Sequence, residues 1–109
     1  MSRKATDRVK QYHQMSAMLT PSPDVNDVIH VVGTSVVLAA TILDPDNAVP
    51  YQYKWEQIPI ADVNALFGSS AAATTTFGPL ISGYTYYITL TVINSQETKM
   101  TKTFRVAVL

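Results

Sequence analysis

The chain has 109 residues, a length that suits a single domain. Hydrophobic residues make up 47% and charged residues 15%, which favours a folded globular chain over general disorder. No apolar run approaches the roughly 18 residues of a transmembrane helix, so we expect no membrane span. The formal net charge of +0 gives no general basis for binding nucleic acid.

The N-terminal segment has helical spacing and a basic character. Apolar residues recur at intervals of three or four in Ala5, Val9, Tyr12, Met15 and Leu19. An isolated helix of this length is marginal, so the spacing predicts an arm over residues 1–20 that needs a surface to order it. That surface belongs to the chain's own body, to another protein or to a second copy, with a membrane surface as a weaker fourth possibility. The residues predicted to make a partner contact are Arg3, Lys4, Arg8, Val9, Lys10, Tyr12, Met15 and Leu19.

Prolines separate this arm from the rest of the chain. Thr20-Pro21-Ser22-Pro23 places two prolines at alternate positions, which disfavours both helix and strand. We therefore expect an arm with its linker over residues 1–23, helical or extended, and a body over residues 24–109.

The body shows the alternation of a sheet protein. Turn residues divide it into short runs in which apolar and polar residues alternate. The predicted strands cover residues 28–32, 36–42, 50–57, 73–77, 84–93 and 99–108, and the last two form a hairpin through residues 94–97. The segment 58–72 fits either a short edge strand or a loop. About seven strands around a central tryptophan predict an all-β, immunoglobulin-like sandwich.

Two groups of residues in the body have different expected roles. A core is predicted at Leu38, Trp55, Tyr86, Leu90 and Val92, with the Tyr86 hydroxyl hydrogen-bonded to backbone as in a tyrosine corner. A surface contact patch is one interpretation of Tyr51, Tyr84 and Tyr87, because tyrosine is favoured at interfaces. Cross-strand packing is the alternative for these three tyrosines.

The sequence offers little catalytic or metal-binding chemistry. The absence of cysteine excludes disulfides and cysteine metal sites, and mildly favours assembly in a reducing compartment. Asp44, Asp46 and Asn47 could offer oxygens to Ca²⁺, but their spacing matches no EF-hand loop and a turn explains them equally. His13 and His30 have no ligand partners at useful spacing. We expect no enzyme, no metal and no cofactor.

The order of these signals resembles a known family. The motifs are a glycine before a Val-x-Leu strand, an aromatic-x-Trp strand, a Thr-Phe strand and a Tyr-x-x-x-Leu-x-Val-x-Asn strand. Here they are Gly33 with residues 36–40, Tyr53-Lys54-Trp55, Thr76-Phe77 and residues 86–94. Over residues 26–108 the chain is similar to PKD-like immunoglobulin-like domains. It departs from many of them after the tryptophan, where Glu56-Gln57-Ile58-Pro59 replaces an Asp-Phe-Gly-Asp-Gly-like turn.

The resemblance implies a non-enzymatic module that spaces, adheres or binds. No secretory signal follows the basic N-terminal residues, so if Met1 is the true start the chain is made in a cytoplasm. We therefore expect a virion accessory protein of a tailed phage, on capsid or tail, that docks by its arm and displays the sandwich. Its partners would be shell or tail subunits or further copies of itself. The alternative is an extracellular or cell-surface adhesion module that binds protein or glycan and belongs to a larger protein.

Overall fold

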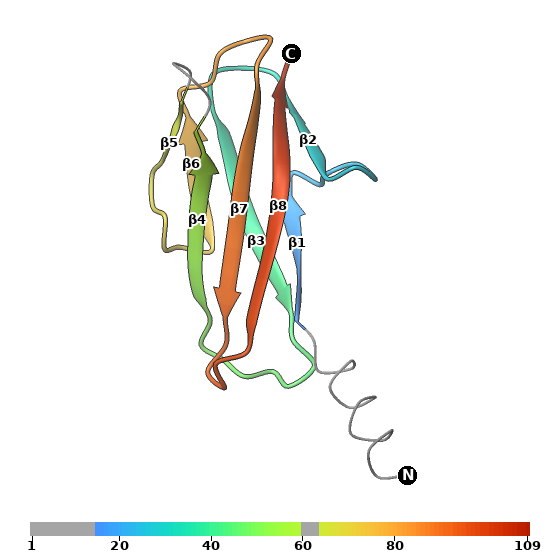
Figure 1. The fold of residues 1–109 in the computed structure, drawn as a ribbon, viewed down its shortest axis with the longest axis vertical. Helices are drawn as coiled ribbons and strands as arrows, with labels where there is room; N and C mark the ends of the chain where they lie inside the picture. The colour runs from blue at the N-terminus through green and yellow to red at the C-terminus, as the bar shows by residue number, and fades with distance from the viewer. Residues whose placement is uncertain (1–14, 60–63) are drawn as a thin grey trace.

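The computed structural model describes residues 15–59 and 64–109, and within them the chain forms two four-stranded sheets packed face to face (Figure 1). One sheet has the order β1-β3-β6-β5 and the other the order β2-β8-β7-β4. The predicted all-β immunoglobulin-like sandwich is confirmed. The strands are β1 (Ser16–Thr20), β2 (Val28–Val31), β3 (Val36–Leu43), β4 (Gln52–Ile58), β5 (Leu66–Phe67), β6 (Thr74–Gly78), β7 (Thr85–Ile93) and β8 (Lys99–Val108). None of the described residues forms a helix long and apolar enough to cross a membrane.

The hairpin of β7 and β8 is the longest pairing and follows the predicted boundaries closely. Residues from Thr85 to Ile93 pair antiparallel with residues from Lys99 to Ala107. The turn is held by buried Asn94, whose Oδ1 accepts the N–H groups of Gln96 and Thr98, both at 2.9 Å. Such an Asx turn fixes the register of the hairpin and hence which side chains face outward.

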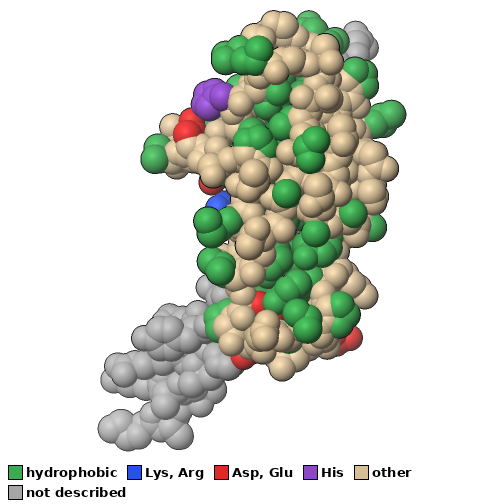
Figure 2. All heavy atoms as spheres, turned by 180° about the vertical axis from the view of Figure 1, so that it is seen from behind, with side chains coloured by type: hydrophobic (Ala, Val, Ile, Leu, Met, Phe, Trp, Pro, Cys, Tyr) green, Lys and Arg blue, Asp and Glu red, His purple; other side chains and the backbone are tan. Residues whose placement is uncertain are grey.

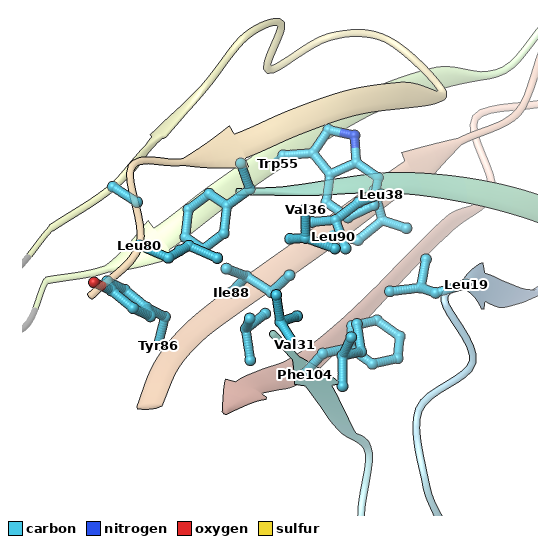
Figure 3. Close-up of a cluster of buried hydrophobic side chains, with 14 of the residues drawn as sticks. Leu19, Val31, Val36, Leu38, Trp55, Leu80, Tyr86, Ile88, Leu90 and Phe104 are labelled. Atoms are coloured by element: carbon cyan, nitrogen blue, oxygen red, sulfur yellow. The ribbon is translucent and has the colours of Figure 1, made fainter. Parts of the chain in front are cut away.

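The core occupies the space between the two sheets. Leu38, Tyr86, Leu90 and Val92 are fully buried and Trp55 is 2% exposed. Figure 3 shows these side chains, except Val92, which it does not label, gathered between the layers with Leu19 and Phe104. The Trp55 indole donates its N–H to the Ala72 carbonyl at 2.8 Å, so its one polar atom is satisfied.

Aromatic rings connect one sheet to the other through this core. The centroids of Trp55 and Phe67 are 6.0 Å apart, those of Phe67 and Phe77 are 4.6 Å apart, and those of Phe77 and Tyr86 are 5.7 Å apart. Offset and edge-to-face ring pairs of this kind are worth about 0.5–1.5 kcal/mol beyond their buried area. The chain of rings therefore joins β4 and β7 of one sheet to β5 and β6 of the other.

The predicted arm is wrong for its last residues. Met15 and Leu19 were expected on a partner, but each is only 3% exposed in the core, and Ser16–Thr20 is strand β1. Residues four apart lie on one face in a helix and also in a strand, so the spacing of Met15 and Leu19 fits both periods. The sandwich therefore begins before the predicted linker. The helix predicted over residues 1–14 lies outside the described residues.

The ambiguous segment 58–72 contains a short strand. β5 pairs with β6. The residue before it, Ala65, is held by the Gln57 side chain, which accepts the Ala65 N–H at 3.0 Å and donates to the Ala65 carbonyl at 2.7 Å. The backbone N–H of Trp55 also donates to the Ser70 carbonyl at 2.8 Å. The backbone at Ser70 thus covers part of the outer edge of β4.

Asp24 organises the segment that carries the chain from β1 in one sheet to β2 in the other. Its Oδ1 accepts the backbone N–H groups of Asn26 and Val28 at 2.8 and 3.1 Å, and its Oδ2 lies 2.9 Å from Nε2 of His30. The hydrogen bond to His30, followed by those from the two backbone N–H groups, holds the pKa of Asp24 below its ordinary value. The ionised carboxylate therefore stabilises the crossover.

The place of β1 in the core can be tested by changing adjacent residues that face opposite ways. Leu19→Ala should lower the free energy of unfolding by about 2–4 kcal/mol, because it removes a buried side chain and leaves a cavity. Met18→Ala, at an exposed position on the same strand, should change it by less than about 0.5 kcal/mol. Urea unfolding followed by tryptophan fluorescence measures both. Equal effects of the two changes would show that β1 does not pack as described.

The role of Asp24 predicts a pH dependence. Because folding lowers its pKa, its contribution to stability is complete above the ordinary value of 3.8 and is lost as the pH falls through the lowered folded value. Asp24→Asn lacks the charge at every pH. The difference between the urea midpoints of the wild type and this variant should be present at about pH 5 and shrink towards pH 2. A difference that does not vary with pH would contradict this role.

Candidate binding surface

Two of the three tyrosines predicted as a contact patch lie at one end of the β2-β8-β7-β4 sheet. Tyr87 is 42% exposed near the start of β7, and Tyr84 is 44% exposed just before it. The Tyr84 carbonyl accepts the N–H of Val108 at 3.0 Å, which ties this residue to the end of β8. Both residues are therefore partly exposed near the C-terminal end of the last strand, and the alternation of β7 places Tyr87 on its outer face.

The register of the sheet places Tyr87 between two further outward side chains. Tyr87 is paired with Ile58 on β4 and with Arg105 on β8. Neighbouring Tyr86, Phe104 and Val106 are buried, and because side chains alternate along a strand, Tyr87 and Arg105 point to the outer face. We call Ile58, Tyr87 and Arg105 the Tyr87 row.

Arg105, the cross-strand partner of Tyr87, keeps hydrogen-bonding capacity. One guanidinium nitrogen donates to the Asn26 carbonyl at 3.0 Å, which orients the group. A guanidinium carries five N–H donors in a planar fork. The Tyr87 row thus combines an aliphatic side chain, an aromatic ring and a fixed cationic donor across three adjacent strands.

Tyr86 fixes the direction in which Tyr87 points. It is fully buried, and its hydroxyl accepts the backbone N–H of Ile81 at 2.9 Å. This is the hydrogen bond expected of a tyrosine corner, and it joins the start of β7 to the preceding turn. Tyr87, the next residue, is consequently held outward on a rigid strand.

Tyr51 does not belong to this patch, which corrects the grouping of the three tyrosines. It precedes β4, whose first residue pairs with Ile93 at the far end of β7. Ile93 lies six positions along β7 from Tyr87, a distance of roughly 20 Å in a strand. Tyr51 packs partly against the core, and desolvation followed by the charge of Asp44 raises the pKa of its phenol.

Asp44, one of the possible calcium ligands, has its carboxylate hydrogen-bonded within a turn. The carboxylate of Asp44 accepts the N–H groups of Asp46 and Ala48 at 3.1 and 2.9 Å, and Nδ2 of Asn94 lies 3.3 Å from it. Although desolvation alone would raise it, these hydrogen bonds hold the pKa of Asp44 below its ordinary value. In the part of the chain that the structure describes, no three His, Cys, Asp or Glu side chains are grouped as metal ligands.

The other predicted partner contacts fall outside the described residues. They are Arg3, Lys4, Arg8, Val9, Lys10 and Tyr12, so docking by the arm stays a prediction. His13, for which no role as a metal ligand was expected, also lies outside the described residues. His30 is on β2, and its Nε2 is hydrogen-bonded to Asp24.

Arg105 and Ile58 were missed by the sequence interpretation. The signal for Arg105 was present, because predicted strands that end at Ile93 and begin at Lys99 pair these two residues and so set Arg105 opposite Tyr87. Ile58 had no such signal, since it lies at the end of a strand whose boundary the following Pro59 obscured.

Comparison with protein families gives a match over most of the sandwich. The model of the K319L-like PKD domain matches residues 25–108, which confirms the resemblance predicted for residues 26–108. A search of curated proteins finds no match.

Solved structures of PKD domains share the fold. The chain superposes on the PKD domain of human KIAA0319 with a TM-score of 0.63 and 20% identity, covering 87% of this chain and 80% of that one. For the PKD domain of the KIAA 1837 protein the TM-score is 0.57 and the identity 21%, with coverage of 85% and 86%. At these identities the likeness shows the fold alone.

A third solved structure contains the fold within a longer chain. It is a nucleoside hydrolase-related hypothetical protein from Saccharophagus degradans that is associated with carbohydrate metabolism. The TM-score is 0.69 at 17% identity, and 89% of this chain is covered. The match spans only 26% of that protein.

Proposed function

The chain belongs to the K319L-like PKD domain family, and on that premise we propose that it is a non-catalytic binding module of a larger extracellular or cell-surface protein. The match over residues 25–108 carries this proposal, because it covers nearly the whole described sandwich. The S. degradans structure supports it, since there the same fold makes up about a quarter of a longer chain.

The family match favours this role over the virion accessory role expected first from the sequence. None of the matches described above names a capsid or tail protein. The description of the S. degradans protein instead associates it with carbohydrate metabolism. The adhesion-module alternative therefore has the better support.

The tyrosine end of the sheet supplies the proposed binding surface, and carbohydrate is the ligand class that suits it. Tyr84 and Tyr87 expose aromatic surface at one end of β7, where a sugar ring can stack. Arg105 lies in register with Tyr87 and offers donors to sugar hydroxyls or carboxylates. The proposed contact is therefore a sugar ring stacked on an exposed aromatic side chain and hydrogen-bonded by a nearby oriented donor.

A printed glycan array tests this proposal directly. The wild-type chain should bind a subset of glycans, and the double variant Tyr84→Ala/Tyr87→Ala should lose that binding by at least about tenfold, the equivalent of about 1.4 kcal/mol of ring stacking. Both rings are substantially exposed, so folding should be preserved, and thermal unfolding checks this.

The matched control is Thr91→Ala, on the outer face of the same strand but towards its other end. It should leave glycan binding unchanged. A wild-type chain that binds no glycan, or equal losses in the control and the double variant, would contradict the proposed ligand and its location.

A further inference from the structure

Charge is distributed very unequally between the two sheets. None of the four strands of the β1-β3-β6-β5 sheet contains a charged residue. The strands of the other sheet contain Lys54, Glu56, Lys99, Lys102 and Arg105. Figure 2 views the molecule from the side of the first sheet, where apolar and neutral side chains cover the middle and coloured charges lie at the left margin and lower end. We call the outward side of this sheet the uncharged face.

The uncharged face also exposes large apolar side chains. Met18 on β1, Val37 on β3 and Leu66 on β5 are 59%, 57% and 75% exposed. Solvent-facing sheets usually carry charged residues that prevent sheets and edges from associating. Here the strands of the face carry none, while the charged residues Asp24, Asp27 and Lys102 line a hollow beside edge strand β1. A face that lacks charge and exposes several large apolar side chains is a candidate interaction surface.

The exposed Met18 side chain and a hollow lie at opposite corners of the face. The hollow is about 470 Å³ and lies beside β5 and the end of β6, with Leu66, Phe67 and Pro79 in its wall and no charged residue among its lining side chains. Met18 lies on the opposite edge strand, and it pairs with Thr41 near the other end of β3. Met18 and the hollow are therefore diagonal to each other on one sheet.

We propose that the uncharged face is a self-association surface that packs against the same face of a second copy of this chain. A charged partner would lose hydration against this face without gaining an ion pair, so the partner surface must itself be uncharged. The same face of a second copy meets that requirement. A two-fold pair also makes each contact twice, so Met18 of each copy can enter the hollow of the other.

The size of the face sets the strength of this contact. Four strands about 4.8 Å apart and a longest strand of eight residues give at most roughly 500 Å² per copy. The total is then near the lower limit for a specific interface, about 1,000 Å². The pair is therefore weak and reversible for isolated chains, and it strengthens when modules are held close together on one surface. It leaves the Tyr87 row free, because that row lies on the other sheet.

Sedimentation equilibrium of the full chain tests this proposal. The mass of the wild type should rise above the 12.0 kDa of one chain as concentration increases towards about 1 mM. Val37→Lys places a charge on the uncharged face near the start of β3, opposite Thr76 in the wall of the hollow, and should keep the chain monomeric. Leu66→Lys, at a still more exposed position, should do the same, and it keeps the test available if Val37→Lys fails to fold.

The matched control is Thr89→Lys, at the middle of the outer face of the other sheet. It should associate like the wild type. The proposal is overturned if the wild type is monomeric throughout this range, if the two face variants associate like the wild type, or if Thr89→Lys abolishes association equally. Glycan binding does not depend on this contact, so the glycan array and the sedimentation experiment can each contradict one proposal without affecting the other.

Discussion

The packing of the two sheets around Trp55 is the constraint on which the rest of the structure depends. The indole is buried between the layers, its N–H is satisfied by Ala72, and its ring begins the chain of aromatic contacts through Phe67 and Phe77 to Tyr86. Each sheet buries one face in this space, so alternate residues along every long strand are directed outward. The core thereby fixes which side chains are left for contacts with other molecules.

The two outward faces that result differ in chemistry. One carries the Tyr87 row and the charged residues of β4 and β8, while the other has no charge on any of its strands. A module built this way has two separate surfaces, one suited to a polar ligand and one suited to an uncharged protein surface. Because the surfaces are on opposite sheets, the proposed glycan contact and the proposed self-association do not exclude each other.

Much of this fold was predictable from local patterns, and the errors have physical causes. The β7 and β8 hairpin was predictable because strict alternation and an Asn turn specify both strands and their register. β1 was missed because residues 15 and 19 fit a helix and a strand equally, and the prolines after Thr20 suggested a boundary. The separation of Tyr51 from Tyr87 depends on how β4 pairs with β7, which a single sequence does not reveal. The uncharged face was visible in no single strand, because it emerges only when β1, β3, β5 and β6 are brought together.

Amide hydrogen exchange followed by NMR tests most directly whether the two sheets form one cooperative unit around Trp55. Hydrogen-bonded amides inside β3 and β6 should show opening free energies equal to those inside β7 and β8, and all should match the global free energy of unfolding. If the amides of β3 and β6 instead exchanged through an opening of markedly lower free energy while β7 and β8 stayed protected, the sheets would be separate units. The single core described here, and both surfaces that depend on it, would then be contradicted.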